Sequence, residues 1–219
     1  MKNYSLRAKK GFTLAEVLIT LGIIGVVSAL TIPTLIANYQ EKVTENKVKK
    51  MYNTLSNAVS MAMVENGQVD EWDVNYSSYD SAGDFFKLIE PYLKVSKNCE
   101  RTPGCVYNGV YKYLSGNKHS TNYNTNTNYY KFILNDGSNL WFRVNPDVYD
   151  AGISDVMAIF WYDVNGENEP NQIGKDTFLF HAKPYGLVPH AQDSCQLDSF
   201  GWGCSSYIIK NGNMDYPKS

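Results

Sequence analysis

One acidic side chain lies inside a long apolar segment near the start of the chain. From Gly11 to Gln40 the only charged residue is Glu16. An ionised carboxylate inside a bilayer is energetically costly, so a lone acid in such a segment indicates a function. Glu16 is therefore the first residue whose chemistry needs an explanation.

A second group of residues that could do chemistry lies in the loop "DVNGENEPNQIGKD" at residues 163–176, which is rich in side-chain oxygens. Its carboxylates and amides around a glycine are the ligand chemistry that Ca²⁺ requires. The spacing departs from that of a twelve-residue EF-hand loop and has no matching final acid. If a cation binds, we expect Asp163, Asn165 and Asp176 to hold it. The alternative is a hairpin loop whose Asx and Gly residues form turns.

The four cysteines fall into two close pairs, "CERTPGC" and "CQLDSFGWGC". Four cysteines allow three connectivities. Gly or Pro in each short loop can turn the chain back, which favours pairing Cys99 with Cys105 and Cys195 with Cys204. A zinc site is the alternative, but the two-residue spacing of zinc ligands is missing. Disulfides indicate an oxidising compartment.

No arrangement of residues typical of an enzyme stands out. His119, His181 and His190 do not have the spacing of a helical metal pair. The serines around residues 194 and 205 lack a nucleophile-elbow context, and no glycine-rich phosphate loop occurs. We therefore expect no catalytic activity and no required cofactor.

Aromatic side chains are abundant, with 17 tyrosines, while only 19% of residues are charged. This composition suits an exported protein. Tyr107, Tyr111, Tyr113 and Trp202 have two interpretations: they pack the folded domain, which we favour, or they form a ligand-binding surface.

The charge balance gives no sign of a nucleic-acid partner. The formal net charge is -2, and four of the 20 basic residues lie in the first eleven positions. Without that basic leader the chain is clearly acidic, so nothing beyond exposed aromatics supports DNA binding.

The apolar segment is long enough to cross a membrane, and the basic residues before it are expected to stay in the cytoplasm. It has three interpretations. In the first, the segment is a plain signal anchor, or a signal peptide that is cut near residues 27–29. In the second, Glu16 is present because Thr13 and Glu16 form a capping box at the start of a helix. Alternatively, the chain is cut after Gly11, so that Phe12 becomes the amino terminus and the apolar helix is retained.

The stretch "KKGFTLAEVLITLGIIGVVSALTIPTL" resembles the amino-terminal segment of type IV prepilins and of the pseudopilins of type II secretion systems. The resemblance implies that a prepilin peptidase cuts after Gly11 and that Phe12 is N-methylated. It implies that Glu16 pairs with the terminal amine of a neighbouring subunit, and that Pro33 kinks the helix. Some pseudopilins also bind calcium in a loop near the carboxyl end of the head.

The same resemblance implies a structural role. The expected partners are other pilin or pseudopilin subunits, the prepilin peptidase, an inner-membrane assembly platform and membrane lipid. The precursor would cross the inner membrane once, with its head outside the cytoplasm, and then join an extracytoplasmic filament. Pilus and secretion pseudopilus both stay open. The alternative is an exported or membrane-anchored binding or enzymatic domain with an ordinary signal sequence.

After Gln40 the apolar residues continue at helical spacing, but on one stripe only. We expect one helix from about Phe12 to about Asn66 that ends at Gly67. The predicted organisation is a leader at 1–11, a membrane or filament-core half of the helix at 12–40, an amphipathic half at 41–66, and a disulfide-containing head at 67–219. An ordinary anchored domain on a helical stalk would share this geometry.

Within the head, the pattern predicts a short helix at 81–93 that is disturbed near Pro91. It predicts an exposed, mobile loop at 117–130, "NKHSTNYNTNTNYY", and a hairpin around the Asn-Asp-Gly turn at 135–137. Further strands are expected at 156–164 and 177–181. The fold class is therefore α+β: a long amino-terminal helix packed on a small antiparallel sheet of three to five strands.

Overall fold

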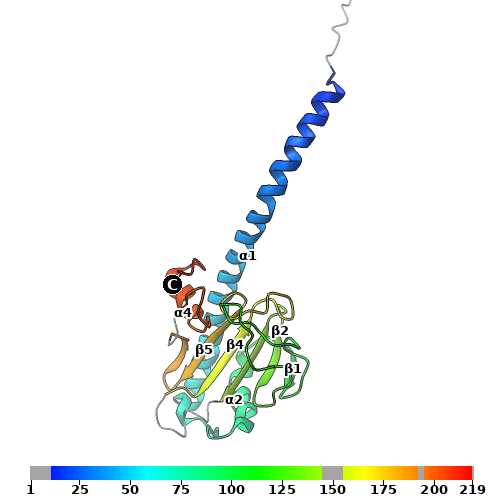
Figure 1. Ribbon diagram of the computed structural model, residues 1–219. Coiled ribbons are helices and arrows are strands. Elements are labelled where there is room, and N and C mark those ends of the chain that lie inside the picture. Colours follow the sequence, from blue (N-terminus) through cyan, green and yellow to red (C-terminus); the bar gives the residue numbers. More distant parts are fainter. Residues whose placement is uncertain (1–10, 145–154, 192–194, 219) are drawn as a thin grey trace, which may run out of the picture. The chain divides into compact units, whose positions relative to one another are not determined.

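A computed structural model describes residues 11–144, 155–191 and 195–218 (Figure 1). The leader at residues 1–10 lies outside the described residues. The chain divides into two compact units, and the division falls between Glu41 and Lys42. One helix, α1 (Leu14–Asn66), contributes residues to both units.

The first unit consists of the amino-terminal half of α1. Its side chains are almost all exposed, and most of them are apolar. Among the described residues, α1 is the one helix that is long and apolar enough to cross a membrane, by length and composition only. The hydroxyls of Thr20 and Thr31 donate to backbone carbonyls of the preceding turn, at 2.9 Å in each case. These polar groups are thus satisfied within the helix, as a lipid environment requires.

In the second unit, the rest of α1 packs its apolar stripe into the head. The buried residues are Val48, Met51, Leu55, Ala58, Val59 and Ala62. The helix ends at Asn66 because Gly67 adopts a left-handed φ of 82° and its amide donates to the carbonyl of Met63 at 3.0 Å. This is the expected glycine stop.

The head contains one antiparallel sheet in which strands adjacent in sequence are also adjacent in space, in the order β1-β2-β3-β4-β5-β6. The strands are β1 (Val95–Glu100), β2 (Tyr130–Leu134), β3 (Asn139–Val144), β4 (Ala158–Asp163), β5 (Thr177–Lys183) and β6 (Gly186–Pro189). The α+β prediction is confirmed, and so are the hairpin at 135–137 and the two later strands. The sheet has six strands rather than three to five.

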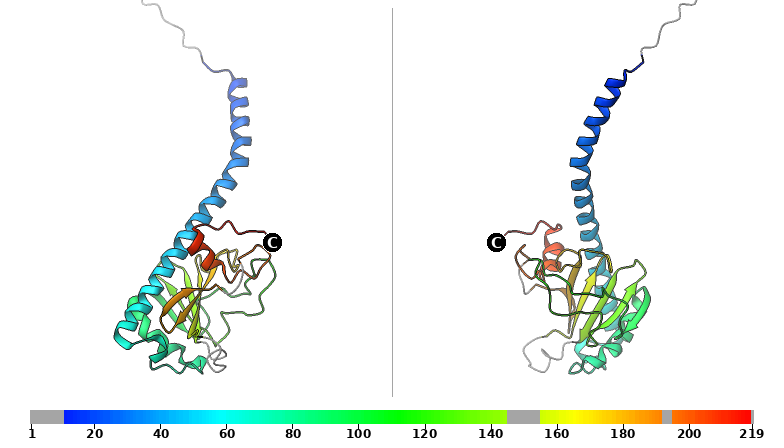
Figure 2. Two further views of the ribbon diagram at one scale, coloured as in Figure 1. Left: turned by 90° about the vertical axis from the view of Figure 1, so that its left-hand side faces the viewer. Right: turned by 45° about the vertical axis from the view of Figure 1, so that its right-hand side comes forward.

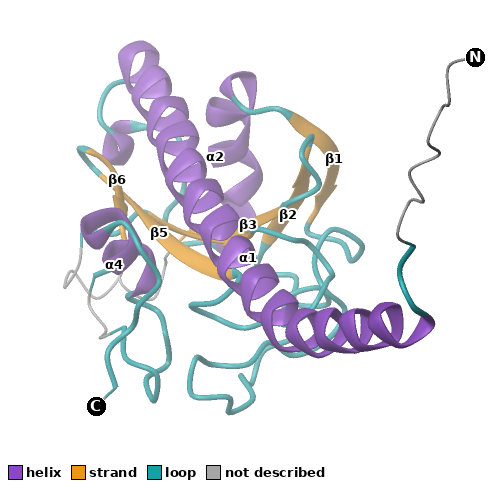
Figure 3. Ribbon diagram, turned by 90° about the horizontal axis from the view of Figure 1, so that it is seen from above, coloured by secondary structure: helices purple, strands orange, loops and turns teal. Residues whose placement is uncertain are grey.

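The two faces of the sheet carry two separate cores. On one face the rings of Phe142, Phe160 and Phe180 lie side by side across β3, β4 and β5. These rings pack with α1 and with α2 (Ala82–Ile89) in a single cluster of buried side chains, and Figure 3 shows both helices over the sheet. On the opposite face, Trp141 and Trp161 are cross-strand partners. This strict alternation is what a sheet covered on both sides requires.

The second core is covered by the chain between β1 and β2, which lies on the side of the sheet away from α1 (Figure 2). The expectation of an exposed loop at 117–130 holds for Asn117, Lys118, Ser120, Thr125 and Thr127 but is wrong for the tyrosines. Tyr123 and Tyr129 are buried, and both rings contact Trp161. The composition misleads because tyrosine counts as polar in a loop, yet its ring covers apolar surface as well as a phenylalanine does.

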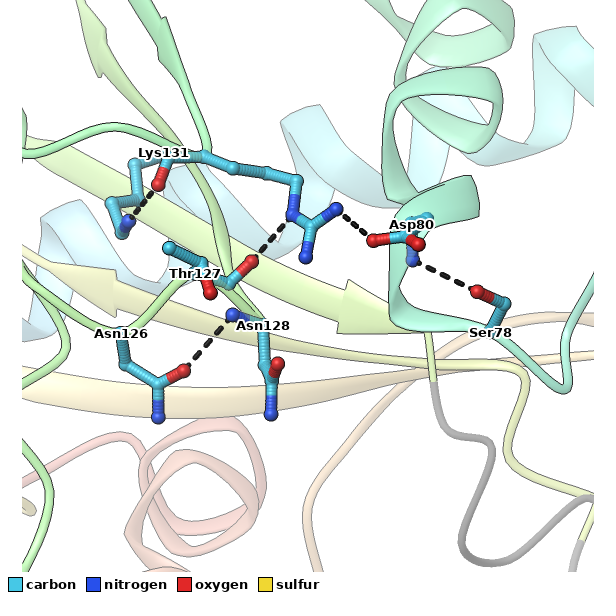
Figure 4. Close-up of polar contacts among 7 residues, drawn as sticks. Ser78, Asp80, Asn126, Thr127, Asn128 and Lys131 are labelled. Atoms are coloured by element: carbon cyan, nitrogen blue, oxygen red, sulfur yellow. Dashed lines mark hydrogen bonds and ion pairs between the residues drawn. The ribbon is translucent and has the colours of Figure 1, made fainter.

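The asparagines of this covering segment shape its turns. The side-chain oxygen of Asn126 accepts from the backbone amide of Asn128 at 2.9 Å (Figure 4). The side-chain oxygen of Asn122 does the same for the amide of Asn124 at 3.0 Å. Such Asx turns let the chain change direction without a strand or helix.

Three elements were not expected from the sequence: β1, β6 and the short helix α4 (Cys204–Asn211). The predicted helix at 81–93 appears as α2 followed by a 3-10 turn, Glu90–Tyr92, which contains Pro91. Two further 3-10 turns, Val69–Glu71 and Tyr79–Ser81, connect α1 to α2.

Candidate functional site

The first turn of α1 holds the residues on which the resemblance depends. Gly11 and Phe12 precede the helix and are exposed, with Phe12 89% accessible. The Glu16 carboxylate accepts hydrogen bonds from the backbone amide and the hydroxyl of Thr13, both at 2.8 Å. The Glu16 amide donates to the Thr13 hydroxyl at 3.3 Å. The capping box is therefore formed.

The capping box uses only one of the two oxygens of the Glu16 carboxylate. Both bonds from Thr13 reach the same oxygen, Oε2. Oε1 has no hydrogen bond to another described residue. The capping role and a contact with another molecule are thus compatible, because they use different oxygens of one side chain.

Pro33 lies inside α1. Proline has no amide hydrogen, so the carbonyl of Ala29 lacks its usual helical donor. The helix nevertheless continues on both sides of Pro33, and the kink stays a prediction.

The loop between β4 and β5 brings two carboxylates together in the head. Asp163 ends β4 opposite Thr177, the first residue of β5, and Asp176 directly precedes that strand. Both carboxylates are buried. Asp163 accepts from the hydroxyl of Tyr111 at 2.7 Å and from the amide of Asn165 at 3.1 Å.

Asp176 accepts from two consecutive backbone amides, those of Asn171 and Gln172, both at 2.7 Å. Burial raises the pKa of Asp176 to about 6 despite these bonds. Burial, with the negative charge of Asp176 nearby, also raises the pKa of Asp163 well above its usual range. The pair thus concentrates negative charge where water cannot solvate it.

Two amide oxygens in the same loop have no hydrogen-bond partner although they are buried: Oδ1 of Asn165 and Oδ1 of Asn171. Asn171 is only 4% exposed, and its φ of 48° lies in the left-handed region that asparagine tolerates. Buried oxygens without donors are rare in folded proteins. Beside two carboxylates they fit a hard cation such as Ca²⁺, which takes carboxylate and amide oxygens together.

Among the described residues no three His, Cys, Asp or Glu side chains group around a common point. The loop therefore does not fit zinc, which prefers histidine and cysteine. Asn171 was not among the predicted ligands. The only sequence feature that could have indicated Asn171 as a ligand is its place in the loop. Its side-chain oxygen lacks a donor because of the backbone conformation, which the sequence does not show.

The histidines and the tyrosines have structural surroundings. His181 and His190 share a hydrogen bond of 2.8 Å between Nε2 and Nδ1, a pairing across β5 and β6 that the sequence spacing did not reveal. Tyr111 lies in the second core, and Tyr107, Tyr113 and Trp202 pack against it. The packing interpretation of these aromatic residues is confirmed.

Lys131 is the most deeply buried amine in the part of the chain that the structure describes, at 0% exposure. Burial and the nearby Arg101 lower its pKa to about 8. Its ammonium donates to the carbonyl of Arg101 at 2.9 Å, while the Arg101 side chain contacts Asp80 and the carbonyl of Thr127 (Figure 4). These contacts tie the covering segment to the sheet and offer no nucleophile–base arrangement.

Both local disulfides are present, Cys99–Cys105 and Cys195–Cys204. The pairing favoured from the sequence is confirmed, and a zinc site built on these residues is excluded.

The first comparison with known proteins concerns the class. Residues 6–32 match the prokaryotic N-terminal methylation motif, the signature of type IV prepilins and pseudopilins. With a long apolar helix that continues into an α+β head, this motif supports a type IV pilin-like protein.

The second comparison concerns the family. Residues 34–213 match a family of unknown function, DUF6613, and the chain belongs to that family. No curated protein and no solved structure matches the chain.

Proposed function

We propose that this protein is a structural subunit of an extracytoplasmic filament, a type IV pilus or a type II secretion pseudopilus. This proposal rests on the surface of the amino-terminal half of α1. Its apolar side chains are exposed on all sides, and Glu16, the only charged residue from Gly11 to Gln40, lies in the first turn. One oxygen of its carboxylate has no hydrogen bond to another described residue. A surface of that kind requires lipid or other apolar helices around it.

In the proposed pathway, a prepilin peptidase cuts the membrane-anchored precursor after Gly11 and methylates the amine of Phe12. The positive amine then pairs with Oε1 of Glu16 on a neighbouring copy. Such a contact joins different surfaces of two copies, so it repeats along an open filament instead of closing into a dimer. The pairing also offsets the cost of placing a carboxylate in an apolar helix bundle.

The first test is the mature amino terminus of the protein extracted from membranes, measured by mass spectrometry. We expect an N-methylated Phe12. A chain that begins near Leu30 would contradict the proposal and support the alternative, an exported domain with an ordinary cleaved signal. The second test is the recovery of the protein in filaments sheared from cells, with detection by immunoblotting.

We also propose that the β4–β5 loop binds Ca²⁺ through Asp163, Asn165, Asn171 and Asp176. The two unpartnered amide oxygens and the buried carboxylate pair support this proposal. A cation would neutralise the repulsion between the acids and satisfy the orphaned oxygens. Its effect would be to stabilise the loop that joins β4 and β5.

The test is the melting temperature of the full-length protein in detergent, with EDTA, with Mg²⁺ and with Ca²⁺. We expect Ca²⁺ alone to raise it. Asn171→Gly removes the amide oxygen while keeping the left-handed backbone accessible, so this variant should lose the response. An unchanged response in Asn171→Gly would exclude Asn171 as a ligand, and no response in the wild type would leave only the turn interpretation.

A further inference from the structure

A groove lies beside α1 in the head, at the side of the sheet where β1 and β2 are found. Its volume is about 280 Å³. Its apolar lining includes Met51 from α1, Leu134 from β2 and Tyr162 from β4. Its charged lining consists of three lysines, Lys47, Lys50 and Lys94, and one acid, Asp136. The groove therefore combines an apolar floor with a basic rim.

The positive charge of this groove is only partly neutralised. Lys94 is exposed and forms no ion pair with another described residue. Lys50 is 3.9 Å from Asp136, and its side chain is 73% exposed, so that pair is weak. Lys47 donates to the carbonyl of Val164 at 2.6 Å. A basic groove is notable on a chain whose formal charge is negative overall.

The size of the groove decides what kind of ligand it fits. Small-molecule sites usually measure about 300–1,000 Å³ and enclose most of their ligand. At about 280 Å³ this groove falls just below that range. It suits one or two side chains of a protein partner that carries apolar and acidic groups together.

A segment with that chemistry is present on the same chain. Leu197 and Phe200 are 41% and 54% exposed, and the exposed Asp198 lies between them. We call residues 197–200 the anchor loop. Asp198 forms no ion pair with another described residue. Large exposed apolar side chains next to an unpaired acid match the apolar floor and basic rim of the groove.

The anchor loop is held in one conformation. The Cys195–Cys204 disulfide closes it at both ends. The amide of Leu197 donates to the carbonyl of Pro217 at 3.1 Å, and the carbonyl of Ser199 accepts from the amide of Ser115 at 3.0 Å. A pre-formed loop loses little conformational entropy when it binds.

The groove and the anchor loop lie on different sides of the head. Lys94 directly precedes β1, the first strand in the sheet order, whereas the anchor loop lies between β6, the last strand, and α4. Figure 3 shows β1 and β2 on one side of α1 and α4 on the other. Because its own loop is fixed on the far side, a head cannot fill its own groove. Contact between two copies would then join unlike surfaces, which is the geometry of an open filament.

We infer that the anchor loop of one copy docks in the lysine-rimmed groove of the next copy. Leu197 enters the apolar floor together with the exposed part of the Phe200 ring, which keeps its contact with Tyr113 of its own chain at 4.7 Å between ring centroids. Asp198 pairs with Lys94 or Lys50. This inference rests on the proposed filament function and adds a head-to-head contact to the contact between helices. It also assigns a role to the second disulfide, which keeps the anchor loop in its binding conformation.

The direct test is site-specific photo-cross-linking in sheared filaments, with p-benzoylphenylalanine in place of Phe200. We expect a cross-linked product of two copies, with peptides from the groove segments 47–54, 92–94 or 134–136. Cross-links that map elsewhere, or to a different protein, would overturn the inference. If the unmodified protein never reaches the filament fraction, the proposed function fails, and the inference fails with it.

Charge reversal provides an independent test. Lys94→Glu and Asp198→Lys should each lower recovery in filaments by roughly tenfold, since the remaining charge meets a like charge or loses its partner. The double variant should recover most of the loss. Lys118→Glu makes the same charge change at an exposed lysine outside the groove and should assemble normally. Equal recovery of Lys94→Glu and Lys118→Glu in filaments would refute the docking while leaving the helix-based proposal intact.

Discussion

The two halves of α1 are built from the same backbone and have opposite relations to solvent. Up to Glu41 the helix exposes apolar side chains in every direction, whereas beyond it the apolar residues form one buried stripe. The second half is stabilised within a single chain by the sheet that it covers. The first half has no such partner among the described residues of its own chain. The apolar side chains of the first half must therefore be buried by lipid or by other protein molecules.

The largest expected effect concerns the acid in the first half. Glu16→Ala should reduce recovery in sheared filaments by more than about tenfold, because the amine of the neighbouring copy would lose its partner. Glu16→Gln is the matched control, since glutamine keeps the capping box and removes only the charge. If the charge matters, both variants fail to assemble. If Glu16→Gln assembles as well as the wild type, capping alone explains the residue. Neither variant should change the melting temperature of the head.

The next prediction compares one leucine from each half. Leu55 is fully buried under the sheet, and Leu21 is 60% exposed. Leu55→Ala should lower the free energy of unfolding of the head by about 2–5 kcal/mol, through lost burial and the cavity left behind. Leu21→Ala should leave that free energy unchanged. Urea denaturation in detergent measures both, and equal effects would mean that the two halves do not differ in packing.

A smaller effect should appear in the pH dependence of the head. Burial, with His190 and Lys183 nearby and only Asp155 opposing, lowers the pKa of His181 to about 3. The folded state therefore keeps His181 neutral while the unfolded state gains a proton below about pH 6.5. The stability that His181 contributes is complete above pH 6.5 and is lost as the pH falls.

Linkage sets the size of this loss at about 1–2 kcal/mol between pH 6.5 and pH 5. His181→Gln removes the titrating group and should flatten that part of the stability curve, measured by urea denaturation at several pH values. An unchanged slope in the variant would assign the pH dependence to other groups. The first half of α1 has no histidine, so no matching dependence is expected there.

Parts of this structure were predictable because their signals are local. The Asn-Asp-Gly turn at 135–137 marks the β2–β3 hairpin, and Gly67 marks the end of α1. β1 was missed because "VSKNCE" is a mostly exposed edge strand without apolar alternation. The burial of Tyr123 was missed because it depends on Trp141 and Trp161, which are distant in sequence. In the candidate cation site, the acids follow from composition, but the orphaned oxygen of Asn171 follows only from the fold.

The smallest expected effect compares two glycines: Gly67, which directly follows α1, and Gly22 in the first half of α1. Gly67 has a φ of 82°, and a Cβ there would lie 2.5 Å from Oε2 of Glu71. Gly67→Ala should cost about 1 kcal/mol of stability, because alanine resists the left-handed conformation and the end of the flexible Glu71 side chain can move aside. At Gly22 the backbone is helical, and an added Cβ would have no neighbouring atom within 4 Å. Gly22→Ala should therefore leave unfolding of the head unchanged in the same urea titration. A loss of head stability in Gly22→Ala would show that the first half of α1 contributes to the fold of the head, and the contrast between the two halves would have to be abandoned.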